Sequence, residues 1–384
     1  MADSPSPRAP ELAAAVAVGS VDHRSVRIWA RVPTESESPL AFVLFPPEGP
    51  KVQAHVSRRP DASADHTLVF TYPDDFASVP DLRPSTRYRF RLQTDAETLI
   101  GEGGFDTAPT GLADTPDRFC FAFSSCHQPF SKDGTPGDES LAMLAAADRA
   151  LAEHGAKFLL MLGDQVYSDE PAVYSVHGDV HLDDKLKSAL LSASPEEIRA
   201  AYHRQYRRSW AVPGFMRLQS QRVTYCVPDD HEIVDNWGSA PEHATPEWQK
   251  VGAGALQAYF DYQGSRSWPP GTKPPTNLAR SFSYGSIAIF LMDVRSERRG
   301  TEGQEQVLSE AQVEALERFL KTHRDRHAVF IAVGVPIVHI PGWLNRMGEK
   351  ITPKGNDLHD RWSHPPLIPQ RDRILSMLAE HRKA

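Results

Sequence analysis

Cysteine is scarce in this sequence. Its 384 residues include three cysteines, Cys120, Cys126 and Cys226. An odd and small count argues against the disulfide framework of a small secreted domain, and it fits a reducing compartment or a mature fragment. The hydrophobic fraction of 40% is that of an ordinary globular protein, and the length favours two domains over one small core.

The chain also lacks an excess of positive charge and long apolar runs. Lys and Arg number 42 against 50 Asp and Glu, which gives a formal net charge of −8. This balance gives no sign of a nucleic-acid or membrane-surface partner. The Ala/Val run near the N-terminus is too short for a secretory signal or a spanning helix. We therefore expect no nucleic-acid partner and no membrane segment, and we favour a cytoplasmic location.

The first part of the chain has the pattern of an all-β domain. Short alternating or apolar runs are separated by clusters of Pro, Gly, Asp and Ser. The predicted strands are Ser25–Val32, Leu40–Phe45, His66–Tyr72 and Arg87–Thr94. The segment from Asp81 to Thr110 resembles the last two strands of a fibronectin type III or immunoglobulin-like domain. We predict a small β-sandwich over residues 10–110, with a generic β domain as the alternative, and a linker at Pro109–Pro116.

From Asp117 onward, apolar runs of strand length alternate with helical periodicity, which predicts an α/β domain over residues 117–384. The predicted strands are Arg118–Ser125, Lys157–Leu162, Arg222–Pro228, Ser286–Asp293 and Ala328–Pro336. The predicted helices are Glu139–His154, Tyr202–Trp210, Ala253–Phe260, Ser309–His323 and Pro369–Ala384. Ser309 and Gln312 form a plausible capping box at the start of the fourth helix.

Polar motifs follow four of these strands. They are Ser124–Cys126, Gly163–Tyr167, Asp229–Glu232 and Asp293–Arg295. Ligands of open α/β sheets gather outside the carboxyl ends of strands, so these side chains are expected to converge. A single strand-end Asp is as well explained by local capping. The ordered set of four motifs is a more specific signal. Convergent carboxylates repel one another unless a cation or protons intervene, and a bound metal ion is the simplest choice.

These four motifs, in this order, resemble those of the alkaline phosphatase D (PhoD-type) family of metallophosphoesterases, where they read SC, GDxxY, DDHE and DxR. The resemblance extends from about Val18 onward. It implies an immunoglobulin-like N-terminal domain and a four-layered α/β/β/α catalytic domain. It also implies an enzyme that hydrolyses phosphodiesters or phosphomonoesters with iron and calcium ions, other divalent metals being possible.

The resemblance further implies a role for each matching residue. Cys126 and Tyr167 would ligate the iron, Asp164 would bridge metals, and Asp230 would be a further ligand. His231 would act on the leaving group or on the charge that develops at phosphorus. In the last motif, Arg295 would bind phosphate through its planar guanidinium, although a structural pair with Asp293 is an equal alternative.

Other polar residues have plainer interpretations. Cys226 lies inside an apolar strand and is interpreted as core, as is Cys120. His127 beside Cys126 is expected to support the site or face solvent. Trp362 and Asn356 lie in a polar loop that resembles the family's substrate-side loop, and we expect them near the site without ligating metal. The GDVH segment at residues 178–181 has the spelling of the family's last metal motif, but it lacks a preceding strand and is interpreted as an insertion loop.

Two functional hypotheses remain from the sequence. The first is metal-dependent hydrolysis of a small phosphoester, with the preference for monoesters or diesters left open. The second is a truncated or non-catalytic family member, because no GDxH or GHxH motif follows Pro336. On that second hypothesis we predict that the catalytic domain lacks its C-terminal strands and closing metal ligands.

Overall fold

The largest sheet joins strands from both ends of the described chain. The computed structural model describes residues 11–33, 38–111, 118–176, 184–268, 271–338 and 359–383. Six strands form the sheet, in the order β5 (Thr67–Tyr72), β2 (Val26–Arg31), β1 (Ala15–Val21), β10 (Val223–Val227), β9 (Phe158–Leu162) and β8 (Ala122–Ser124). β8, β9 and β10 run parallel, whereas β1, β2 and β5 alternate in direction.

The central position of β1 differs from the sequence-based expectation. In the sequence, the Ala/Val run near the N-terminus was interpreted only as too short for a secretory signal or a spanning helix. In the structure it forms a strand that is buried over Ala15–Val18. β1 pairs in parallel with β10, with Val18 opposite Val223, and antiparallel with β2. Strands from within residues 10–110 therefore continue the sheet that carries β8, β9 and β10, and the division into two domains stays a prediction.

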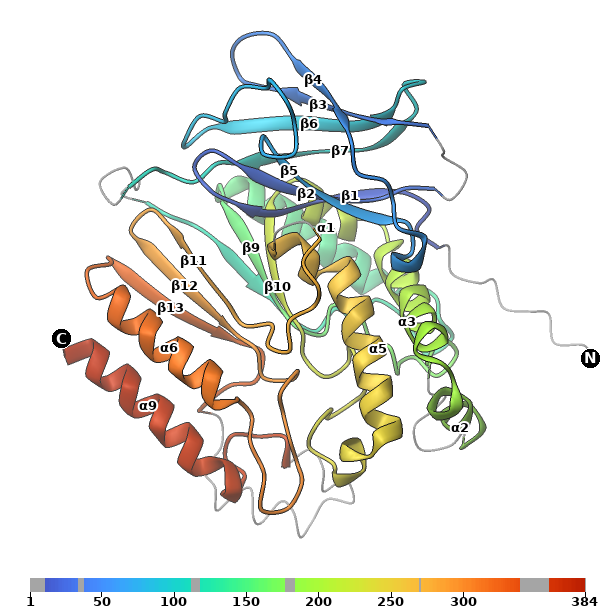
Figure 1. The fold of residues 1–384 in the computed structure, drawn as a ribbon, viewed down its shortest axis with the longest axis vertical. Helices are drawn as coiled ribbons and strands as arrows, with labels where there is room; N and C mark the ends of the chain where they lie inside the picture. Colours follow the sequence, from blue (N-terminus) through green and yellow to red (C-terminus); the bar gives the residue numbers. More distant parts are fainter. Residues whose placement is uncertain are drawn as a thin grey trace, which may run out of the picture.

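A second sheet covers one face of the N-terminal strands. It has the order β4 (Val52–Val56), β3 (Leu40–Phe45), β6 (Arg87–Thr94) and β7 (Leu99–Asp106), with all pairs antiparallel. Its Phe42 and Phe90 share one hydrophobic cluster with Ile28 and Phe70 of the first sheet. The rings of Phe42 and Phe70 meet edge to face at 5.3 Å between centroids. The second sheet and the strands β1, β2 and β5 of the first sheet lie at the top of Figure 1.

A third sheet lies between β9–β10 and two helices. It consists of β11 (Arg280–Tyr284), β12 (Ile287–Met292) and β13 (Ala328–Val333). Alternate residues of β12 point to opposite faces of the sheet. Ile289 and Leu291 share a cluster with residues of β9 and β10, whereas Phe290 and Met292 share one with α6 (Glu310–Thr322) and Ile374 of α9 (Ile368–Lys383). Figure 1 shows α6 and α9 on the outer side of this sheet.

The remaining helices cover the other side of β9 and β10. They are α1 (Asp138–Glu153), α2 (Asp184–Ser192), α3 (Pro195–Trp210), α4 (Phe215–Ser220) and α5 (Pro246–Tyr262). Leu159, Met161 and Cys226 share a hydrophobic cluster with residues of α1, α3 and α5. Four short 3₁₀ helices complete the described elements, namely η1 (Ala62–Ala64), η2 (Pro241–Ala244), η3 (Gly264–Ser267) and η4 (Pro365–Leu367). Among the described helices, none has the length and apolarity needed to cross a membrane.

The five predicted helices are confirmed, with two corrections at their starts. α3 and α5 begin seven residues earlier than predicted, and both have Pro at the first helical position, where its missing N–H costs nothing. Ser194 and Glu197 form the capping box of α3, a signal that the sequence contained. At α6, Ser309 accepts a hydrogen bond from the Gln312 N–H, but the Gln312 side chain binds the main chain of Asp293 instead.

Candidate metal centre

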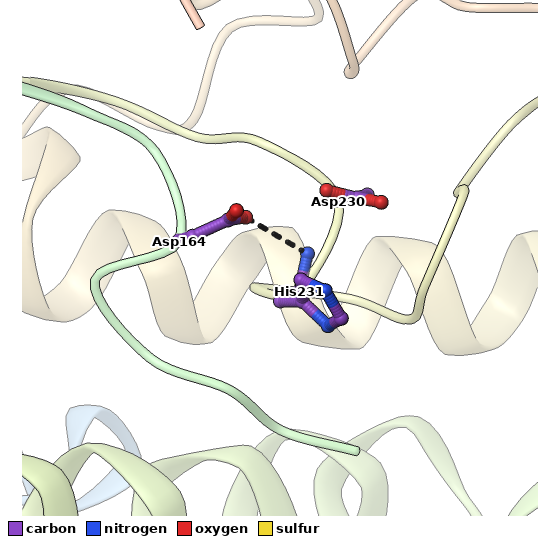
Figure 2. Close-up of side chains that lie close together, drawn as sticks. All are labelled: Asp164, Asp230 and His231. Atoms are coloured by element: carbon purple, nitrogen blue, oxygen red, sulfur yellow. Dashed lines mark hydrogen bonds between the residues drawn. The ribbon is translucent and has the colours of Figure 1, made fainter. Parts of the chain in front are cut away.

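The carboxyl ends of β8, β9 and β10 meet at one edge of the first sheet. The register places Ser124 beside Met161, and Leu162 beside Val227. The loops that follow carry Asp164 and Asp230 to within reach of each other. Ligand atoms of Asp164, Asp230 and His231 all lie within 4.8 Å of one another (Figure 2). The dashed line there is the 3.3 Å hydrogen bond from the His231 main-chain N–H to Asp164.

The turn after β9 depends on Gly163. Its φ is +92°, and a Cβ there would lie 2.2 Å from the Cβ of Asp229. The two strand ends therefore approach more closely than any other residue would permit. Asp164 and Cys126 also have positive φ values, 55° and 58°. Such backbone geometry is unfavourable for residues other than Gly, and it is concentrated at functional sites.

A thiol and a phenol complete the cluster. The Cys126 Sγ lies 3.3 Å from Asp164 Oδ2. The Tyr167 ring stacks on the imidazole of His231, with centroids 4.1 Å apart. Burial, and then the charge of Asp164, raise the pKa values of both Cys126 and Tyr167. The sequence-predicted ligands Cys126, Asp164, Tyr167 and Asp230 are thus neighbours, and a thiolate or phenolate there would need a nearby cation.

The side chain of Glu232 joins the two loops that carry Asp164 and Asp230. Its side chain is fully buried. One carboxylate oxygen accepts hydrogen bonds from the main-chain N–H groups of Asp164 and Asp229, each at 2.9 Å, and the other accepts from Gln165 at 2.7 Å. Glu232 belongs to the third of the four strand-end motifs, but the sequence alone indicated no role for it. It fixes the relative position of the segments that carry Asp164 and Asp230.

The buried carboxyl groups of this edge are short of positive charge. Burial raises the pKa of Asp164 to about 7, and the charges of Asp230 and Glu232 add to the effect. Burial likewise raises the pKa values of Asp229 and Glu232 to about 7. Clustered carboxylates, a thiol and a phenol are a donor set that fits metal ions, and a bound cation would remove this electrostatic penalty.

Arg295 is buried within this network and engages carboxylates. Its side chain is 1% exposed, and its guanidinium donates to Asp229 and, at 2.5 and 2.8 Å, to the two carboxylate oxygens of Asp360. A third carboxylate, that of Asp230, lies 3.5 Å away. Arg295 also contacts Asp293, as one of the two predictions had it. The donor, however, is the main-chain N–H of Arg295 and not its guanidinium. Asp360 was not identified from the sequence.

His231 is oriented by Asp169, which was not identified from the sequence. The His231 Nδ1 lies 2.7 Å from Asp169, whose other oxygen accepts from the Asp235 N–H at 2.7 Å. Burial lowers the pKa of His231, but the Asp169 hydrogen bond and the charges of Asp169, Asp230 and Asp164 outweigh it and raise the pKa to about 11. The imidazole is therefore held in its charged form with Nε2 away from Asp169. In the sequence, the feature that could have pointed to Asp169 was its position two residues after Tyr167.

The remaining candidates lie in different places. Cys226 is buried in the core as predicted, and Cys120 is partly buried against the same cluster. The His127 ring stacks on Phe215 with centroids 3.9 Å apart, and burial lowers its pKa to about 4. Trp362 is buried in the hydrophobic cluster beside α6 instead of lining the site. The GDVH segment and Asn356 lie outside the described residues.

Comparison with known proteins points to one family. A model of the PhoD-like phosphatase family matches residues 121–383. The alkaline phosphatase D of Bacillus subtilis (strain 168) is 29% identical over 224 residues, which cover 56% of this chain and 34% of that protein. The matched part thus spans about a third of that relative's length. A solved structure of PhoD matches 98% of this chain and 71% of that chain, with a TM-score of 0.67 at 18% identity, and shows a common fold.

Proposed function

Because the chain belongs to the PhoD-like phosphatase family, we propose that it hydrolyses a small phosphoester with bound metal ions. The observation that carries this proposal is the convergence of Cys126, Asp164, Tyr167 and Asp230 at one sheet edge, where buried carboxyl groups lack positive charge. Phosphodiesters and phosphomonoesters are both candidate substrates.

We assign these four residues as the metal-holding set. Bound ions would supply positive charge for the phosphoryl oxygens and lower the pKa of the attacking water. Iron beside Cys126 and Tyr167, with calcium on the carboxylates, is the expected combination, since thiolate and phenolate suit iron and carboxylates suit calcium. Glu232 keeps the loops of Asp164 and Asp230 in register.

His231 is proposed as the proton donor to the leaving group. Asp169 holds Nδ1, so Nε2 is the atom that can deliver a proton to the departing oxygen. A bound cation near Asp164 and Asp230 would reduce the stabilisation of the imidazolium and make the proton easier to release. The assignment predicts that His231→Asn slows the hydrolysis of alkyl phosphoesters far more than that of p-nitrophenyl esters, whose leaving group needs no proton. Equal loss on both substrates would contradict it.

Arg295, the other candidate catalytic residue, is better explained as a positioning residue. Its guanidinium is occupied by Asp229 and Asp360, with Asp230 close by. We propose that it holds the Asp229–Asp230 segment against the repulsion of neighbouring carboxylates. In a buried site, removing such a partner costs about 3–5 kcal/mol, so Arg295→Met should reduce stability and metal affinity together.

The test of the main proposal combines metal analysis with turnover. Purified protein is expected to contain iron and calcium and to hydrolyse bis(p-nitrophenyl) phosphate or p-nitrophenyl phosphate. Asp164→Asn should lose both metal and activity, whereas a distant surface change such as Arg318→Ala should lose neither. Metal-free, inactive protein of normal fold would refute the proposal and leave the non-catalytic hypothesis.

We make two further proposals, about architecture, and family membership supports the first of them. We propose that residues 117–384 form a four-layered α/β/β/α domain, and that residues 10–110 form an immunoglobulin-like or fibronectin-like sandwich. The packing of α6 and α9 on one side, and of α1, α3 and α5 on the other, supports the first proposal.

A further inference from the structure

Three consecutive residues after β9 contact His231. The Tyr167 ring stacks on the imidazole with centroids 4.1 Å apart, and Asp169 lies 2.7 Å from Nδ1. Ser168 lies between them in the chain, is fully buried, and contacts main-chain oxygens of the loop that carries His231. The imidazole and the main chain of His231 are therefore both held by one short segment.

The main-chain oxygen of His231 accepts two hydrogen bonds from Ser168. The Ser168 N–H donates to it at 3.0 Å, and the Ser168 hydroxyl donates to it at 2.7 Å. Because a carbonyl oxygen has two lone pairs, this one residue can satisfy it completely. The main-chain oxygen of Ser168 in turn accepts from the Val176 N–H at 2.9 Å, which fixes Ser168 itself. The position of the His231 main chain thus depends on Ser168.

A tyrosine of α3 leaves the proton of the Ser168 hydroxyl available for His231. The Ser168 Oγ also lies 2.9 Å from the main-chain oxygen of Ile233, but a hydroxyl has a single proton to donate. The Tyr202 hydroxyl, on a side chain of a residue that is 1% exposed, donates to the same Ile233 oxygen at 2.9 Å. Since Tyr202 serves Ile233, the Ser168 proton can remain in the shorter bond to His231.

The second ring nitrogen of His231 has a competing acceptor in the same loop. Nε2 lies 3.9 Å from Asp235 Oδ1, which is beyond hydrogen-bond distance. Moving Nε2 about 1 Å closer would form that hydrogen bond and withdraw its proton from a departing oxygen. The Asp235 main-chain N–H is itself held by Asp169 at 2.7 Å. The position of the His231 main chain therefore decides whether Nε2 stays clear of Asp235.

We propose that Ser168 is a positioning residue for His231, whose N–H and hydroxyl fix the loop so that Nε2 faces the leaving group instead of Asp235. The inference rests on the proposed function, in which Nε2 supplies the proton to the leaving group. Tyr202 acts through Ser168, because it satisfies Ile233 and leaves the serine proton to His231. Ser168 and Asp169 together hold the main chain and the ring of one histidine, so neither can tilt alone.

The test compares two leaving groups. Ser168→Ala removes the hydroxyl and keeps the N–H, and it should reduce kcat for an alkyl phosphoester about fivefold. For a p-nitrophenyl ester, whose leaving group needs no proton, the loss should stay below about twofold. A loss of folded protein alone would lower both rates equally. Tyr202→Phe should give the same pattern at about two- to threefold, since the Ser168 proton is then shared with Ile233.

Ser220→Ala is the matched control. Ser220 is also buried, and its hydroxyl lies 3.5 Å from the main-chain oxygen of Arg217. It precedes the start of β10, whereas the site follows the end of that strand. This variant should change the rate with neither leaving group.

A double variant tests the competition with Asp235. Adding Asp235→Ala to Ser168→Ala removes the competing carboxylate and keeps the main-chain N–H that Asp169 accepts from. Relative to Asp235→Ala alone, the serine substitution should then cost less than about twofold with the alkyl ester. An undiminished cost, equal slowing of both esters by Ser168→Ala, or unchanged rates would overturn the proposal.

Hydrogen exchange of the purified full chain provides a measurement that does not depend on turnover. Ser168→Ala should speed amide exchange in peptides that cover residues 166–170 and 231–236, and leave β9 and β10 unchanged. Unchanged exchange in those two loops would refute the positioning role. If exchange responds as expected but the parent protein hydrolyses no phosphoester, the result counts against the proposed function only.

Discussion

Replacing Gly163 by Ala should damage the metal centre through a contact that no side-chain rotation can relieve. The new Cβ would lie 2.2 Å from the Asp229 Cβ and 2.5 Å from the Asp229 main-chain nitrogen. The backbone at φ +92° costs an Ala about 1–2 kcal/mol, partly offset by the loss of chain freedom in the unfolded state. Overpacking adds about 1–3 kcal/mol. We expect a total destabilisation of about 2–4 kcal/mol.

Gly155→Ala is the matched control. Gly155 also has a positive φ, +63°, but a Cβ there would meet nothing within 4 Å, so only the backbone cost remains. Urea unfolding gives the stability of both variants, and phosphodiester turnover reports on the site. Gly163→Ala should reduce turnover at least tenfold, since it separates the segments that carry Asp164 and Asp230. Equal effects of the two variants would refute the inferred role of this close approach.

Three further measurements follow from other parts of the molecule. Burial raises the pKa of Asp65, but hydrogen bonds from Arg31, Arg207 and Tyr262 outweigh it and hold the pKa at about 2. Asp65→Asn should therefore cost about 2 kcal/mol above pH 4, and the difference in urea unfolding from the parent should shrink as the pH falls towards 2. If Cys126 binds iron, its replacement by Ala should remove or shift a visible absorption band; an unchanged spectrum would contradict that assignment. Cys226→Ala should leave the band intact and lower stability, as expected for a buried thiol.

Several strands that are buried on both faces could be predicted because they appear as continuous apolar runs. β9, β10 and β12 are of this kind. β1 has seven residues, more than the five of β9 or β10, but its Ala-rich sequence is a weak strand signal. Its neighbour β10 begins about two hundred residues later, with Val18 opposite Val223. Local pattern predicts that a segment is a strand, but it does not identify a partner so distant in the chain.

The same limit applies to the site. Cys126, Asp164, Tyr167 and Asp230 could be predicted as neighbours because each follows one of the parallel strands β8, β9 and β10. The partners of His231 and Arg295 could not, since Asp169 and Asp360 reach them through loops whose paths depend on tertiary packing. The strand-end motifs and the family resemblance therefore suggested the candidate metal-holding residues, and the structure identified the residues that orient the side chains around them.

The short strand β8 gives the two halves of the candidate metal centre unequal rigidity. It has three residues, lies at the end of its sheet, pairs with β9 alone among the described strands, and includes Phe123, which is 71% exposed. Amide protons of β8 should therefore exchange with solvent well before those of β9 and β10, through local opening that leaves the molecule folded. If Cys126, Asp164 and Asp230 hold an ion as proposed, we expect Cys126, two residues beyond this strand, to release it before the two carboxylates do.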